Sequence, residues 1–339
     1  MSGGTDRRVT VTDSAELLNP GIELLRERGV EVDIVAAGAT AAEAARVAGD
    51  HPVAIIGLLP FRAVEIASLR ETGLLVRAGI GYDVIDVEAA TAAGIWVANV
   101  PDYCVDEVAD HAILLLMAAW RRLPQLQAVW QAGSWVNADL VPPVNRARGR
   151  RLGVVGFGRI GQAVARRAQG FGFEVVAHDP LIAADVMRAV DVEPATIDDV
   201  FATSDAVSLH CPLTAETRHL VDRERLARAK PGLVLVNTSR GGLVDLAALD
   251  EALEHGQVAA AGLDVLEDEP APDLSRPLFR RPSVVLTPHL AWYSLEARRD
   301  LAIQAAEEAY RYLSGERPRN LVNPGAREAP SMRDGGGRP

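Results

Sequence analysis

The chain has 339 residues, which is enough for two domains with cores of ordinary size. Its hydrophobic content of 48% and charged content of 24% exclude a disordered or fibrous protein and predict a packed globular fold. The formal net charge of −11 argues against sequence-independent nucleic-acid binding, because a basic face is needed to neutralise phosphates.

The first hundred residues alternate short apolar runs with Ala-, Glu- and Arg-rich stretches of helical character. This rhythm predicts βαβ units on a parallel sheet, with strands at 9–11, 32–36, 54–59, 74–78 and 96–100. A long apolar helix is predicted over 106–122. It suits a connector between two domains, with the boundary near Val105.

The segment that follows, residues 125–148, is predicted to be irregular and contains Trp130, Trp135 and two consecutive prolines. Two interpretations stay open: a surface excursion, or an arm over 123–150 that packs on another subunit. The βα pattern then resumes and predicts a six-stranded, doubly wound sheet, with strands at 152–155, 174–177, 206–209, 233–237, 260–263 and 284–286. A final helix is predicted at 295–313, and residues 326–339 are predicted to be a disordered tail.

Neither a membrane segment nor a metal site is indicated. No apolar run approaches the roughly 18 to 20 residues that cross a bilayer. Residues 1–13 are polar and lack a signal-peptide core, so we expect a cytoplasmic location. The two cysteines, Cys104 and Cys211, are far apart and lack metal-ligand spacing, which argues against a disulfide framework and a zinc site.

A glycine-rich string directly follows the strand predicted at 152–155 and opens a helix. Its context is that of a dinucleotide-binding loop, in which the glycines allow a tight turn and close approach to a pyrophosphate, and the string is Gly156, Phe157, Gly158, Arg159, Ile160 and Gly161. Asp179 ends the next strand and is placed to bind the ribose 2′-hydroxyl and repel a 2′-phosphate. We therefore predict NAD rather than NADP, although the neighbouring His178 leaves that preference open.

Other candidate cofactor contacts stand at the ends of later strands, where open α/β sheets hold their ligands. Each could instead be a turn or a helix cap, and they are His210, Cys211, Pro212, Asn237, Thr238, Ser239 and Asp264.

Three more strand-end residues have the chemistry that reduction of a keto acid requires: a cation for the carboxylate and carbonyl, and an acid for the oxygen. Arg240 offers a fork that matches a carboxylate. His289, with a carboxylate partner such as Glu269, can deliver a proton near neutral pH. Taken singly, these residues could equally be a surface ion-pair residue, a packed histidine and a solvated loop acid.

The strings around these residues resemble the D-isomer-specific 2-hydroxyacid dehydrogenases, from about Leu74 to about Leu313. The resemblance is carried by Val-Val-Gly-Phe-Gly-Arg-Ile-Gly, His-Cys-Pro-Leu-Thr-Ala-Glu-Thr ending at Thr217, Asn-Thr-Ser-Arg-Gly-Gly-Leu-Val-Asp, Gly-Leu-Asp-Val-Leu-Glu-Asp-Glu-Pro and Leu-Thr-Pro-His. It implies NAD as cofactor, reversible hydride transfer between NADH and a 2-keto acid, and Arg240, Glu269 and His289 as the catalytic triad. Thr217 joins the expected cofactor contacts.

The same resemblance implies an α/β fold of two Rossmann-like domains with doubly wound parallel sheets. The substrate domain would be flavodoxin-like and split in sequence, formed by residues 1–105 and 296–325. Residues 106–295 would form the cofactor domain, through which the protein would make a homodimer.

A second Gly-x-Gly loop is expected to grip the substrate carboxylate through its backbone N–H groups, and its residues are Gly79, Ile80 and Gly81. Arg77 before this loop and Trp292 after His289 resemble the C-terminal binding protein branch, in which they line the substrate site. For Trp292, plain core packing is the alternative. Because that branch includes transcriptional corepressors, an NAD-sensing binding protein is the rival to an enzyme, but no DNA-binding module or basic tail favours it.

Overall fold

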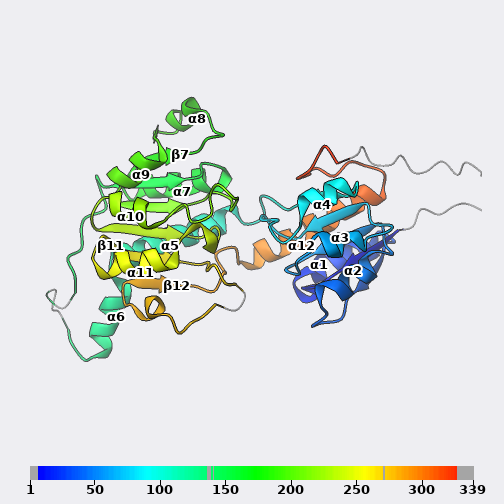
Figure 1. The fold of residues 1–339 in the computed structure, drawn as a ribbon, viewed down its shortest axis with the longest axis horizontal. Helices are drawn as coiled ribbons and strands as arrows, with labels where there is room; N and C mark the ends of the chain where they lie inside the picture. The colour runs from blue at the N-terminus through cyan, green and yellow to red at the C-terminus, as the bar shows by residue number, and fades with distance from the viewer. Residues whose placement is uncertain (1–6, 136–138, 140, 270–271, 327–339) are drawn as a thin grey trace, which may run out of the picture. The chain divides into compact units, whose positions relative to one another are not determined.

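The computed structural model describes residues 7–135, 139, 141–269 and 272–326 (Figure 1). The chain divides into two compact units, one of residues 1–103 and 294–339 and the other of residues 104–293. Both units contain a parallel sheet covered by helices, which confirms the predicted α/β class. Within the described ranges, no helix is long and apolar enough to cross a membrane.

The first unit has a five-stranded parallel sheet in the order β2-β1-β3-β4-β5, the flavodoxin-like order. Its strands are β1 (Arg8–Val11), β2 (Glu31–Ile34), β3 (Val53–Ile56), β4 (Leu74–Arg77) and β5 (Trp96–Ala98). Two helices that are distant in sequence pack together on it, α1 (Ala15–Glu27) and α12 (Leu295–Leu313). The other helices are α2 (Ala41–Ala48), α3 (Ala63–Ala67) and α4 (Val87–Ala92).

The second unit has a seven-stranded parallel sheet in the order β12-β11-β10-β9-β6-β7-β8. Its strands are β6 (Arg151–Val155), β7 (Glu174–His178), β8 (Val192–Pro194), β9 (Ala206–Leu209), β10 (Leu233–Asn237), β11 (Val258–Leu263) and β12 (Val284–Leu286). Its helices are α5 (Val105–Trp120), α6 (Leu123–Gln131), α7 (Arg159–Gly170), α8 (Ala184–Arg188), α9 (Ile197–Thr203), α10 (Arg223–Arg228) and α11 (Leu246–Glu254), with short 3₁₀ turns η2 (Gly241–Leu243) and η3 (Pro277–Arg280).

The prediction of six strands in this unit was wrong by one, because β8 was missed. It has three residues at the edge of the sheet, of which only Val192 is buried and one is a proline. Such a short edge strand produces no apolar run. The six predicted strands are all present.

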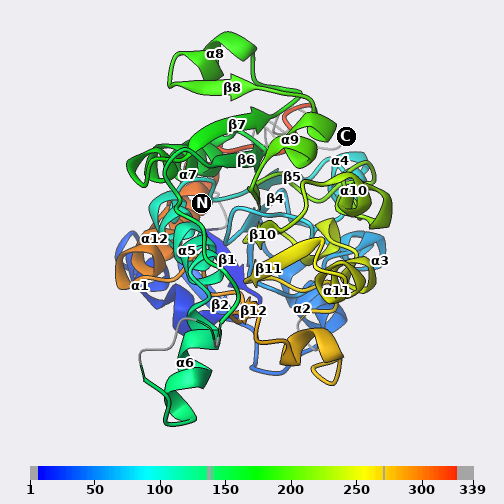
Figure 2. The same cartoon turned by 90° about the vertical axis from the view of Figure 1, so that its left-hand side faces the viewer.

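The second sheet is buried on both faces, because helices cover each of them. Val234 and Val236 of β10 lie in the apolar cluster under α5 and α7. Leu233 and Leu235 lie in the cluster under α10 and α11, on the opposite face (Figure 2). Successive strand residues point to opposite faces, so the uninterrupted apolar run of β10 is what a doubly covered parallel strand requires.

Two predictions of segments without regular structure, at 125–148 and 326–339, need correction. The segment expected to be irregular begins with helix α6, which carries Pro124 in its first turn, a position where proline is well tolerated. The expected disordered tail begins at Ala326, but this residue is buried and its carbonyl accepts a 2.6 Å hydrogen bond from Trp96 Nε1. The rest of that predicted tail, 327–339, lies outside the described residues.

Candidate active site

The three glycines after β6 have different surroundings. Gly156 has a φ of 90°, and a Cβ there would lie 2.5 Å from the backbone of His210. A Cβ on Gly161 would lie 2.1 Å from the Gly156 carbonyl, so this glycine lets α7 pack against the turn. A Cβ on Gly158 would meet nothing within 4 Å. The first and third glycines thus serve the fold, whereas the second leaves open space where a pyrophosphate would approach the backbone.

These surroundings predict opposite results for two alanine variants. Gly161→Ala is expected to destabilise the protein by about 1–3 kcal/mol, because its methyl group meets backbone rather than a movable side chain. Gly158→Ala is expected to leave the melting temperature unchanged and weaken NADH binding at least about ten-fold. Thermal denaturation and fluorescence titration with NADH measure the two effects, and equal NADH affinity in Gly158→Ala would contradict a ligand at this turn.

The Asp179 carboxylate holds the glycine turn. Its Oδ2 accepts a 2.7 Å hydrogen bond from the Phe157 N–H, and its Oδ1 accepts one of 2.8 Å from the Leu181 N–H. Each carboxylate oxygen has a second lone pair, so these bonds leave capacity for a ribose hydroxyl. The Phe157 side chain lies in the core and Ile160 packs against it, so Phe157 can face a ligand only through its backbone.

Two buried polar atoms at neighbouring strand ends have no hydrogen-bond partner among the described residues: His210 Nδ1 and Thr238 Oγ1. The other ring nitrogen of His210 lies 2.7 Å from Ser208 Oγ. Burial lowers the pKa of His210 to about 3, so the ring is neutral at working pH. Because buried polar atoms are nearly always paired, these two atoms fit a polar ligand such as a dinucleotide beside the glycine turn.

Two of the other residues expected to contact the cofactor, Ser239 and Thr217, form hydrogen bonds within the protein. Ser239 Oγ donates to the Leu209 carbonyl, and Thr217 Oγ1 donates to the Pro212 carbonyl. Burial raises the pKa of the Cys211 thiol to about 11, so this cysteine stays protonated and is no nucleophile. Arg159 is exposed at the start of α7. These contacts shape the loops around the glycine turn.

The structure brings Glu269 and His289 together from different loops. His289 Nδ1 and Glu269 Oε2 are 2.5 Å apart, and Glu269 Oε1 accepts a hydrogen bond from the Leu266 N–H. Burial raises the pKa of Glu269, but the hydrogen bond and charge of His289, the Leu266 N–H and the charge of Arg240 together lower it below its ordinary value. Glu269 is therefore an ionised partner, and Nε2 is the ring atom of His289 left for proton transfer.

His289 has a φ of 54°, an uncommon conformation for a residue with a side chain. The buried Asp264 holds it there. The Asp264 carbonyl accepts the His289 N–H, and its carboxylate accepts the N–H groups of Leu290 (3.1 Å) and Ala291 (2.9 Å). In the described structure the Asp264 carboxylate shapes the histidine loop, and its expected contact with the cofactor stays a prediction.

Two residues of this loop support were not identified from the sequence. Thr287 Oγ1 donates to the Asp264 carboxylate at 2.5 Å, and His111 Nε2 of α5 lies 2.9 Å from the same hydroxyl. Thr287 stands in the Leu-Thr-Pro-His string, which was a usable signal. His111 lies in an apolar helix far away in sequence, where no local pattern marks it.

Arg240 sits in the turn between β10 and η2. The Asn237 side chain braces that turn, because its Nδ2 donates to the Arg240 carbonyl at 2.8 Å and its Oδ1 accepts the Ser239 N–H at 3.0 Å. The Arg240 guanidinium is half-buried and donates to the Ser239 carbonyl. The positive charge of Arg240, like that of His289, lowers the pKa of Glu269, so the three residues expected to form the triad interact electrostatically within the second unit.

Comparison with known proteins agrees with these features. Residues 113–291, more than half of the chain, match the NAD binding domain of the D-isomer specific 2-hydroxyacid dehydrogenases. The chain belongs to this family. A glyoxylate reductase of Korarchaeum cryptofilum is 42% identical over 274 residues, which are 80% of this chain and 82% of the relative. A D-3-phosphoglycerate dehydrogenase of Mycobacterium tuberculosis is also 42% identical, over 263 residues and 78% of this chain.

The solved structures agree with the sequence relatives. A glyoxylate reductase from Paecilomyes thermophila superposes with a TM-score of 0.85 at 28% identity, covering 94% of this chain and 98% of the other. The chain of 339 residues spans about half (49%) of the length of the mycobacterial phosphoglycerate dehydrogenases that it matches. The family and the NAD cofactor are thereby confirmed, whereas the C-terminal binding protein branch is not specified and stays a prediction.

The second Gly-x-Gly loop of the chain, residues 79–81, follows β4 in the first unit. Gly79 is buried beneath the Arg77 guanidinium, and a Cβ there would lie 2.6 Å from Arg77 Nη1. The Ile80 carbonyl accepts a 2.6 Å hydrogen bond from Asn99 Nδ2. The loop thus stands at the carboxyl end of a parallel strand, as a ligand-binding loop should. In the second unit, the Trp292 ring packs edge-on against Tyr293, with centroids 5.6 Å apart.

Proposed function

We propose that the chain is an NAD-dependent D-2-hydroxyacid dehydrogenase that interconverts a 2-keto acid and a D-2-hydroxy acid. The observation that supports this most is the 2.5 Å contact between His289 and Glu269, with the Arg240 charge acting on the carboxylate. The pair lies in the unit that carries the glycine turn. A histidine, a carboxylate and an arginine beside a dinucleotide site are the groups that carbonyl reduction needs.

The cofactor would be held by the glycine turn at 156–161, by Asp179 and by the unpaired buried atoms of His210 and Thr238. When bound, NADH supplies the hydride to the keto carbon. A single carboxylate at Asp179 would disfavour the additional phosphate of NADP, because two negative groups would be brought together.

The side chains supply the remaining chemistry. Arg240 would pair with the substrate carboxylate and polarise the keto oxygen. His289 would give that oxygen a proton from Nε2, while the ionised Glu269 stabilises the imidazolium through Nδ1. In the oxidative direction, the neutral imidazole would take the proton of the hydroxyl group. We also propose substrate contacts through the first-unit loop and the loop after His289, namely Arg77, Gly79, Ile80, Gly81 and Trp292.

A substrate panel tests this proposal. The relatives act, by name, on glyoxylate and D-3-phosphoglycerate, so the panel contains glyoxylate, pyruvate, phenylpyruvate and 4-methylthio-2-oxobutyrate with NADH, and D-3-phosphoglycerate with NAD. Absorbance at the NADH band should change with at least one compound. In the oxidative direction, D-2-hydroxy acids should be oxidised and their L-enantiomers should not. Tight NADH binding without turnover of any compound would instead support an NAD-sensing binding protein.

We further propose a homodimer built through the arm at 123–150, working in the cytoplasm. No residue of α6 is buried, and Leu123, Leu126 and Trp130 are 47%, 43% and 62% exposed. Exposed apolar side chains on one helix suit a subunit contact. Both cysteines are free thiols, as a reducing compartment would keep them.

Light scattering coupled to gel filtration tests the dimer. The wild-type protein is expected to elute at twice the chain mass, whereas Trp130→Glu should be monomeric at low micromolar concentration, because burying an unpaired carboxylate is costly. Gln125→Glu on the same helix is the matched control for added charge. A monomeric wild-type protein, or an undiminished Trp130→Glu dimer, would contradict the arm.

A further inference from the structure

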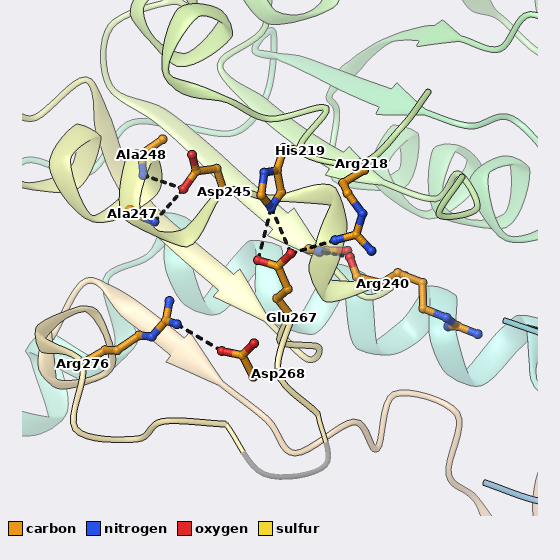
Figure 3. A network of polar contacts seen from close by, with 10 residues as sticks. Arg218, His219, Arg240, Asp245, Ala247, Ala248, Glu267, Asp268 and Arg276 are labelled. Carbon is orange, nitrogen blue, oxygen red and sulfur yellow. Dashed lines mark hydrogen bonds and ion pairs between the residues drawn. The ribbon is translucent and has the colours of Figure 1, made fainter. Parts of the chain in front are cut away.

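A second carboxylate in the loop that carries Glu269 is bound by an arginine and a histidine side chain from another segment. Glu267 Oε1 lies 2.9 Å from Arg218 Nη1 and 3.0 Å from His219 Nε2, and its Oε2 lies 3.2 Å from the same ring nitrogen. Figure 3 shows the Glu267 carboxylate between these two side chains, with the Arg240 side chain pointing away from it. We call Arg218, His219 and Glu267 the brace. None of its members belongs to the proposed proton-transfer pair.

One side of the brace is joined to the turn that presents Arg240. The His219 N–H donates to the Gly242 carbonyl at 2.8 Å, and the Val221 N–H donates to the Leu243 carbonyl at 2.9 Å. His219 adopts a φ of 50° to make these contacts. The segment 219–221 is therefore attached by its backbone to η2, directly after Arg240.

The other side of the brace is joined to the turn that presents Glu269. A Cβ on Gly241 would lie 1.9 Å from the carbonyl carbon of Leu266 and 2.3 Å from the Glu267 nitrogen, so the two turns meet backbone to backbone. The Leu266 N–H donates to Glu269 Oε1 at 2.6 Å. A shift of residues 266–267 would thus move both the Arg240 turn and the carboxylate that binds His289.

We propose that Glu267 is a positioning residue: held by Arg218 and His219, it sets the placement of Glu269 against His289 and Arg240. This inference rests on the proposed dehydrogenase function. The close backbone contact at Gly241 limits how near the two turns can approach, but close packing alone does not prevent them from sliding past each other. Charge-assisted hydrogen bonds to Glu267 are directional and restrain sliding. Misplacement of catalytic groups by fractions of an ångström lowers rate without loss of binding.

The same loop offers a matched control. Asp268 is the next residue, and its carboxylate pairs with Arg276 at 3.0 Å rather than with the segment 218–221 (Figure 3). Glu267→Gln and Asp268→Asn are each isosteric and each remove one negative charge from adjacent positions. Differences between them therefore report the brace and not the loss of charge from the loop.

Two readouts are compared in these variants. With the best substrate of the panel, Glu267→Gln is expected to lower kcat about ten-fold with NADH affinity and melting temperature close to wild type. Asp268→Asn is expected to match wild type. In protein labelled with ¹⁵N-histidine, the His289 ring-nitrogen resonances, assigned through His289→Asn, are expected to shift in Glu267→Gln and not in Asp268→Asn. This second readout requires no turnover.

A variant from the opposite side of the brace completes the test. His219→Asn keeps a residue that tolerates the left-handed backbone but cannot reach Glu267, so it should reproduce the Glu267→Gln effects. The double variant should be no slower than Glu267→Gln, because both changes break one interaction. The inference is overturned if Glu267→Gln and Asp268→Asn agree in both readouts. If the wild-type protein turns over no substrate, the proposed function fails. The His289 resonances then still show whether Glu267 positions Glu269 against His289.

Discussion

Replacing His289 with asparagine is expected to lower turnover by about 10²- to 10⁴-fold and to leave NADH affinity unchanged. The imidazole pairs with the ionised Glu269 carboxylate through Nδ1 and leaves Nε2 for proton transfer. The proposed cofactor contacts at the glycine turn, Asp179, His210 and Thr238 lie on other loops, so this substitution should not change them. Stopped-flow measurement of NADH consumption and fluorescence titration of NADH give the two numbers.

Asparagine is the appropriate substitution because His289 has a φ of 54°, which asparagine tolerates better than alanine does. The melting temperature should therefore stay close to wild type. Glu269→Gln is the companion variant: it keeps the shape but removes the charge that stabilises the imidazolium, so a smaller loss of kcat is expected. Turnover of His289→Asn at the wild-type rate would remove His289 from the mechanism.

Replacing Asp264 with asparagine is expected to destabilise the protein by about 2–4 kcal/mol and to lower kcat as well. The Asp264 side chain is fully buried and accepts hydrogen bonds from Thr287, Leu290 and Ala291. An amide of the same shape would turn an NH₂ group toward one of these donors. Because the loop that they form holds His289 in its left-handed conformation, lost hydrogen bonds should also loosen His289, the proposed proton donor.

Urea denaturation measures the first effect and steady-state kinetics the second. His111→Gln is a graded control, because His111 Nε2 lies 2.9 Å from the Thr287 hydroxyl and 3.6 Å from the Asp264 carboxylate, whereas Asp264 itself accepts the backbone N–H groups of the loop. A smaller loss of stability is expected there. If Asp264→Asn were as stable as wild type but failed to bind NADH, Asp264 would be a cofactor contact, as its position after a strand suggests, and not a support of the loop.

Several features of this protein follow from its sequence alone. The apolar runs at 152–155, 206–209 and 233–237 are buried on both faces and form β6, β9 and β10. Parallel strands end at the same edge of a sheet, so the order of strands along the chain is enough to place the glycine turn, the Arg240 turn and the His289 loop together. The identity of the residues at those ends then indicates their chemistry, and the family strings support the D stereochemistry that we propose for the substrate.

Other features depend on contacts between residues that are distant in the chain. No local pattern in the sequence predicts that the Asp264 carboxylate accepts hydrogen bonds from Thr287, Leu290 and Ala291. His111 lies 176 positions before Thr287, and the periodicity of α5 reports only that the helix is apolar. The brace likewise joins Arg218 and His219 to Glu267, 49 and 48 positions away.

The difference has a physical cause. Burial periodicity, turn chemistry and strand ends are local properties, so about ten neighbouring residues suffice to predict them. Which donor faces a buried carboxylate depends on the packing of several elements at once, since a buried acceptor takes whichever donors the fold brings to it. The sequence by itself thus determined the glycine turn, the identity of the candidate triad and every strand of the second sheet except β8. Only the tertiary structure decided how His289, Glu269 and Arg240 are held in place.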